Sequence, residues 1–179
     1  MENSSHSMDA SPEMKHSGTD QNAGHDNMTH KNSYKNLLWM MLLSFVAMFI
    51  LMYAMVDKLE NVIPNVNQFY MAGLMASPML IIELLLMHKM YPNKKLNAML
   101  MALGVVLLFL FWFGIRFQTA VDDKQFLKSM IPHHAGAILM VEKSDLKDPE
   151  VKKLAEDIIK AQNEEIQFMK DKIKELEAK

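Results

Sequence analysis

The chain has 179 residues, a formal net charge of −2 and a hydrophobic content of 50%. It contains no cysteine, which excludes disulfides, thiolate zinc sites and iron–sulfur clusters. The balanced charge gives no support to nucleic-acid binding, and we expect no nucleic-acid partner. All the sulfur is carried by 19 methionines, whose thioethers bind soft metals without first losing a proton.

Residues 1–35 form a polar segment rich in Ser, Asn, Asp and Gly. Such a segment buries too little apolar surface to fold, so we expect a disordered tail. Its close His/Met pairs can wrap around a metal, although a solubilising tail with chance histidines is an alternative. The metal candidates in the tail are His6, Met8, Met14, His16, His25, Met28 and His30.

Three apolar runs follow, at about residues 37–56, 69–87 and 98–115. Each is long enough to cross a bilayer core as a helix, so residues 36–117 are expected to form a three-helix membrane region. The second loop carries more lysine than the first, which by the positive-inside rule places it and the tail in the cytoplasm. The C-terminal part is then periplasmic or extracellular, on a bacterial inner membrane or a plasma membrane.

The second run carries methionines four residues apart and one carboxylate. At this spacing the residues are neighbours on a helix: Met71, Met75, Met79 and Glu83. An acidic residue inside an apolar span marks a functional position by default, so these four are secondary metal candidates. Flexible packing of the methionines and a protonated or interfacial Glu83 are the alternatives. The same run has small residues that let another helix approach closely, namely Ala72, Gly73, Ala76 and Ser77.

Residues 122–179 have the spacing of two amphipathic helices. Asp122 with Gln125 three positions later predicts a capping box at the start of the first helix. Asp148 and Pro149 predict the N-cap and the first position of the second. Two helices alone form a poor core, so we expect this hairpin to self-associate, most simply as a dimer that completes a four-helix bundle.

The first of these helices carries two adjacent histidines between two methionines. On a helical wheel four residues fall on one side: Met130, His133, His134 and Met140. Imidazole and thioether suit copper and do not suit magnesium or calcium. The pattern predicts a Cu(I) site, although core packing by the methionines is compatible with the same spacing. Glu165 on the facing helix is placed to accept a hydrogen bond from an imidazole N–H.

Three stretches together resemble the domain-of-unknown-function-305 family. They are residues 126–140, which contain Met-Ile-Pro-His-His, residues 148–150 and residues 159–170. The resemblance implies a ferritin-like helical domain that binds copper through His and Met. The Asn-Lys-Lys sequence at residues 93–95 is similar to that of the membrane-anchored branch. The metal ligands that the resemblance implies are Met130, His133, His134, Met140 and Met169. Family members with a complete bundle carry the His-His motif twice, whereas this chain carries it once.

The leading hypothesis is a membrane-anchored copper-binding protein, not an enzyme, that acts in copper tolerance, storage or delivery. No organic cofactor is expected. A copper permease is an alternative, because the His/Met-rich tail, three spans and Met-x-x-x-Met pattern share the layout of trimeric channel-type copper transporters. A membrane scaffold without metal is another. A di-iron oxidase is rejected, because it requires a Glu-x-x-His pair on each of two helices and only Glu13 here is followed by His three residues later.

Overall fold

The computed structural model describes residues 20–178, in which all regular secondary structure is helical. Three long helices form a bundle: α1 (Asp20–Leu51), α2 (Val66–Leu86) and α3 (Lys94–Phe117). Short 3-10 turns lie in their connections: η1 (Met52–Met55), η2 (Leu59–Asn61) and η3 (His88–Met90). The all-α prediction is therefore confirmed.

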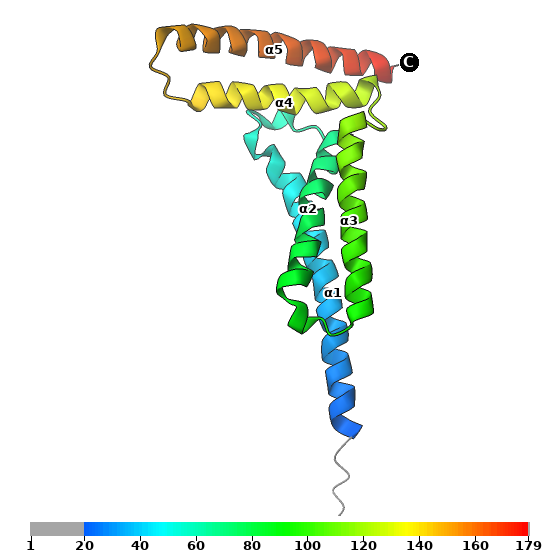
Figure 1. Ribbon diagram of the computed structural model, residues 1–179. Helices are drawn as coiled ribbons and strands as arrows, with labels where there is room; N and C mark the ends of the chain where they lie inside the picture. Colours follow the sequence, from blue (N-terminus) through cyan, green and yellow to red (C-terminus); the bar gives the residue numbers. More distant parts are fainter. Residues whose placement is uncertain (1–19, 179) are drawn as a thin grey trace, which may run out of the picture.

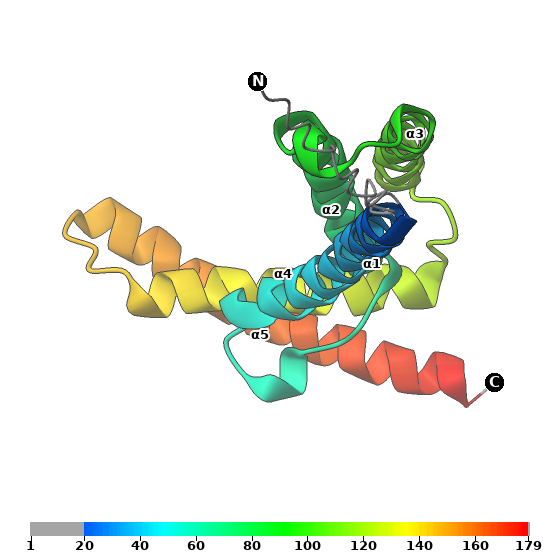
Figure 2. The same ribbon diagram turned by 90° about the horizontal axis from the view of Figure 1, so that it is seen from below.

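Two further helices, α4 (Asp123–Lys143) and α5 (Pro149–Glu177), form a hairpin at one end of the bundle (Figure 1). Viewed along the bundle, the hairpin lies across the ends of α1, α2 and α3, and its helices are not parallel to these three (Figure 2). The helix α4 lies between the bundle and α5, and it contacts η1, η2 and α2. One face of α4 therefore meets the membrane region, while another meets α5.

The predicted spans are confirmed as helices long and apolar enough to cross a membrane: Asn32–Met55, Val66–Leu86 and Lys94–Phe117. The second and third begin earlier than the apolar runs because each has a polar N-cap. The Asn65 side chain accepts the backbone N–H of Gln68, and the Asn93 side chain accepts that of Leu96. These caps add a first helical turn that hydrophobicity alone does not mark.

The helix α1 begins at Asp20, inside the polar segment. The disordered tail predicted up to residue 35 is therefore wrong for residues 20–35, which are helical. A helix nucleated by the apolar span extends into polar sequence at little cost, since each added residue gains a backbone hydrogen bond. The tail candidates His6, Met8, Met14 and His16 lie outside the described residues, as do the side chains of His25, Met28 and His30.

The central contacts of the bundle are made by α2, which packs against both α1 and α3. The small residues of the predicted patch are all buried: Ala72, Gly73, Ala76 and Ser77. The Phe111 ring of α3 lies over Gly73, so closely that an added Cβ would come within 2.4 Å of it. The close helix approach predicted from this patch is confirmed, and the approaching helix is α3 of the same chain.

The hairpin has its own core between α4 and α5. Its buried members are Ile131, Ala135, Ile138, Ile166, Met169 and Ile173. Val56 and Ile63, from the chain between α1 and α2, pack against this core. The α5 helix begins at the predicted N-cap, where Asp148 Oδ1 accepts the backbone N–H of Glu150 at 2.9 Å, with Pro149 in the first helical turn.

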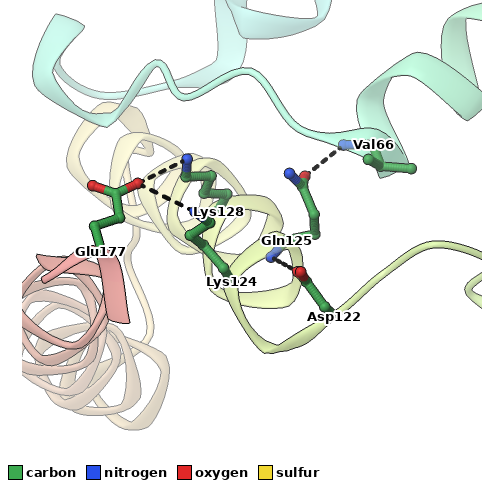
Figure 3. Close-up of polar contacts among 6 residues, drawn as sticks. All are labelled: Val66, Asp122, Lys124, Gln125, Lys128 and Glu177. Carbon is green, nitrogen blue, oxygen red and sulfur yellow. Dashed lines mark hydrogen bonds and ion pairs between the residues drawn. The ribbon is translucent and has the colours of Figure 1, made fainter. Parts of the chain in front are cut away.

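The capping box predicted at the start of α4 is only half formed. Asp122 Oδ1 accepts the backbone N–H of Gln125 at 2.7 Å, as predicted. In a complete box Gln125 Oε1 would accept the N–H of Asp122, but it accepts the N–H of Val66 at 3.2 Å instead (Figure 3). Val66 is the first residue of α2, and the N–H groups in the first turn of a helix have no partner within the helix. Gln125 therefore links the hairpin to the bundle.

Further polar contacts join α2 to α4 and to the segment between α3 and α4. Asn67 Nδ2 donates to Gln118 Oε1 at 3.0 Å and to Ser129 Oγ at 3.3 Å. The Tyr70 hydroxyl donates to the carbonyl of Thr119 at 2.7 Å, in the segment between α3 and α4. The hairpin is therefore docked on the bundle as well as joined to it by the chain.

Candidate metal centre

The two adjacent histidines lie on different sides of α4. Their ring centroids are 6.0 Å apart and their planes are inclined by 58°. His133 lines a cavity between α4 and the bundle, whereas His134 faces Glu165 of α5. Successive residues of a helix are about 100° apart, so two neighbours cannot both occupy the centre of one face. The structure thus separates two rings that the sequence pattern groups together.

A cavity of about 400 Å³ lies between α4 and the bundle. From α4 it is lined by Met130, His133 and Met140, and from the bundle by Met52, Met55 and Met71. Polar atoms come from Tyr53, Asn65, Asn67, Gln68 and Ser129. Asp, Glu, Lys and Arg are absent from the described residues that line it. One imidazole and five thioethers therefore share one uncharged cavity.

The residues of α4 that line the cavity differ in their surroundings. His133 is exposed, so its ring is open to an incoming ligand. Met130 is half-buried and also packs against the hairpin core. Met140 is 54% exposed and borders a second, smaller cavity near the loop between α4 and α5. Of the three, Met130 is the most buried.

His134 is held between α4 and α5, with its side chain 14% exposed. Its Nδ1 lies 3.0 Å from Oε2 of Glu165, the residue predicted to accept from an imidazole. The contact lacks the direction of a hydrogen bond, because buried Nδ1 has no hydrogen-bond partner among the described residues. Burial lowers the pKa of His134, Glu165 opposes this, and His133 adds to the lowering. The neutral ring keeps a lone pair that a metal can use.

The donors around the cavity fit a soft monovalent cation. Thioether sulfur and neutral imidazole are soft or borderline donors. They are also uncharged, so the cavity supplies no negative charge to balance a divalent ion. The described residues contain no cluster of three or more His, Cys, Asp or Glu, the donor sets usual for zinc and di-iron. The donors around the cavity are thus a Met/His set and not one of those sets.

Other predicted candidates lie away from the cavity. Met169 is buried in the hairpin core, on the α5 side of α4. Met75 is exposed and Met79 is half-buried on α2, and neither lines the cavity, in contrast to Met71. Glu83 lies near the opposite end of α2, where it accepts a long hydrogen bond of 3.4 Å from the Tyr91 hydroxyl. Of the candidates in the second span, only Met71 therefore lines the cavity.

Met52 and Met55 line the cavity but were not candidates in the sequence. They sit in η1, at the end of the first span, far along the chain from the His-His motif. A Cβ placed on Gly136 of α4 would lie 3.5 Å from the Met55 carbonyl oxygen, so the two elements are close. No local pattern signals this proximity. The available sign was the overall excess of methionine, which does not say which of them meet.

The comparisons with known proteins match most of this architecture. The domain of unknown function DUF305 matches residues 86–173, from the end of α2 through most of α5. A protein of Acanthamoeba polyphaga mimivirus, "Uncharacterized protein L153", is 33% identical over 136 residues, covering 74% of this chain and 88% of the viral protein. The chain belongs to the DUF305 family. The DUF305 match also includes α3, which lies between the Asn-Lys-Lys sequence at residues 93–95 and the stretches from residue 126 onward that carry the resemblance. No solved structure matches the chain.

Proposed function

We propose that this DUF305 protein is a membrane-anchored copper-binding protein, not an enzyme, that holds Cu(I) for tolerance, storage or delivery. The observation that carries the proposal is the shared cavity of Met130, His133 and Met140, which has no charged lining residue. These residues supply two sulfurs and one nitrogen, the donors that soft copper favours. Copper is the cargo here, and the side chains bind it and shield it from water.

His134 and Met169, which the family resemblance implies as ligands, support this proposal in a different way. Both lie on the α5 side of α4. Packed there, they fix the rotation of α4 about its axis and so aim His133 at the cavity. In this proposal they are positioning residues.

The direct test is a titration of the full chain in detergent micelles with Cu(I), Ag(I) and Zn(II). We expect tight binding of the two soft monovalent ions and weak binding of zinc. The variant His133→Ala/His134→Ala should lose one tightly bound soft ion per chain. The matched control is His88→Ala, an exposed histidine at the opposite end of the bundle, which should bind as the wild type does. Unchanged stoichiometry in the double variant would reject the proposal.

We infer an integral membrane protein whose hairpin faces the periplasm or the cell exterior. The connection between α2 and α3 lies at the bundle end opposite the hairpin and, with the start of α3, carries Lys89, Lys94 and Lys95, whereas the connection between α1 and α2 carries only Lys58. The tail is then cytoplasmic. An alkaline phosphatase fused after the last residue should be active, and a fluorescent protein that folds only in the cytosol should be dark there. The reverse pattern would overturn this orientation.

We also infer that two chains pair through their hairpins and so complete a four-helix, ferritin-like bundle. The support is the apolar surface left open on α5, where Val151, Leu154 and Phe168 are exposed. Burying such surface is worth about 25 cal/mol per Å². The small-residue patch of α2 is already buried within the chain, with Phe111 of α3 over Gly73, so the pairing does not use it. Mass measurement in detergent that finds only monomer, with and without copper, would contradict the pairing.

A further inference from the structure

The sulfur donors of the cavity come from two parts of the protein, the hairpin and the three-helix bundle. Met130 and Met140 belong to the hairpin, while Met52, Met55 and Met71 belong to the membrane bundle. Neither part encloses the cavity alone, because α4 forms one wall and η1 with α2 forms the other. A ligand held from all sides therefore contacts both parts.

A cation in this cavity is stabilised most by donors on both walls, because a wall that lacks a donor leaves the charge against apolar surface. Donors on α4 alone would leave an ion at the cavity facing the bundle. The bundle wall opposite α4 carries three thioethers. Methionine has three rotatable bonds and a polarisable sulfur, so these side chains can converge on an ion from across the cavity.

The absence of charge among the lining residues narrows the class of ion. No carboxylate of the described residues lines the cavity, so a bound ion keeps its full charge there. Desolvation costs rise steeply with charge, which favours a monovalent ion over a divalent one. Among monovalent ions, those that thioethers prefer are soft.

We propose that the cavity is a bipartite site for a soft monovalent cation, Cu(I) or Ag(I), completed by Met52, Met55 and Met71 of the membrane bundle. The proposal rests on the proposed function and names bundle ligands for it. The hairpin begins the ligand set with His133 and Met130, and the bundle closes it. The ion then fastens the hairpin to the membrane end of the protein.

This arrangement couples metal binding to the docking of the hairpin, because an ion that binds only the docked state stabilises that state. The connection most exposed to a change in docking is the segment between α3 and α4. Gln118 and Ala120 there are exposed, and both adopt positive φ, which is uncommon for residues other than glycine. Bound metal should therefore protect this segment from proteolysis.

The test compares two triple variants of the full chain in detergent. Met52→Leu/Met55→Leu/Met71→Leu removes the bundle thioethers while keeping apolar side chains of similar volume, a swap that cores tolerate. Met87→Leu/Met90→Leu/Met99→Leu is the matched control, with three exposed methionines that do not line the cavity. The readouts are Ag(I) affinity by competition, the sulfur and nitrogen count at the ion by X-ray absorption, and the rate of cleavage between α3 and α4.

The cavity variant should bind Ag(I) at least tenfold more weakly than the wild type, with fewer sulfur ligands and with no metal-dependent protection. The control variant should match the wild type in all three readouts. If the cavity variant kept wild-type affinity and sulfur count while His133→Ala lost binding, the bipartite site would be overturned and the proposed function would stand. If the wild type bound no soft ion, both would fall. Circular dichroism checks the fold, and the sulfur count of the wild type alone tests the site if a variant does not fold.

Discussion

The two faces of α4 differ in packing, although they belong to the same helix. On the α5 face, Ile131 and Ile138 are 0% and 1% exposed and pack in a closed apolar core. On the bundle face, Met130 and His133 border an open cavity of about 400 Å³. A closed face stabilises the hairpin and has no room for a ligand, while an open face with soft donors has that room. Under the proposed function, His134 on the closed face has a structural role and His133 on the open face binds the ion.

The largest effect should come from breaking the closed face. Ile138→Ala removes buried methyl groups from the core and leaves a cavity, so we expect the hairpin to lose about 2–5 kcal/mol of stability. Met140→Leu, at a side chain that is 54% exposed, should change stability by less than about 1.5 kcal/mol. Thermal unfolding in detergent, followed by circular dichroism, measures both. Equal losses in the two variants would mean that the faces do not differ in packing.

The next effect separates the two histidines by function. We expect His133→Ala to weaken Cu(I) binding at least tenfold more than His134→Ala, a difference of about 1.4 kcal/mol or more. The reason is that His133 lines the cavity, while His134 only helps to hold α4 against α5. Competition with a chromogenic Cu(I) chelator gives both affinities. A larger loss in His134→Ala would reverse the assignment of the two faces.

The smallest effect concerns the contact between His134 and Glu165 on the closed face. In the metal-free protein, Glu165→Gln removes the charge that raises the pKa of His134, so this pKa should fall further below its ordinary value of 6.5. The stability change at neutral pH should be less than about 1 kcal/mol, because Glu165 is 55% exposed. Titration of the histidine ring signals by NMR measures the pKa, with Glu164→Gln as the neighbouring control.

The sign of the pH dependence follows from the lowered pKa of His134. The unfolded chain binds a proton at this ring more readily than the folded protein does, so stability is complete above the ordinary value of 6.5 and declines as the pH falls below it. In Glu165→Gln the decline should be larger, since the folded pKa is lower still. An unchanged acid dependence would show that Glu165 does not act on His134.

Sequence patterns that depend on near neighbours along the chain were reliable for this protein. The three apolar runs predicted the three spans, because crossing a bilayer requires a continuous apolar helix whatever its partners. Asp122 and Asp148 predicted both helix starts of the hairpin, because a cap joins groups only two or three residues apart. The half-formed capping box shows where such local patterns fail, because Gln125 accepts a hydrogen bond from Val66, which is far away in sequence.

The composition of the cavity was decided by tertiary structure. A helical wheel groups His133 with His134, but the packing of α4 between two partners assigns each ring to a different one. Met52 and Met71 share a cavity with His133 only because the hairpin docks across the end of the bundle. Apolar periodicity fixes which residues are buried and leaves open which element buries them, since any apolar surface of the right shape satisfies the hydrophobic effect. The sequence therefore determined the helices and the kinds of donor available, and docking alone determined which donors meet.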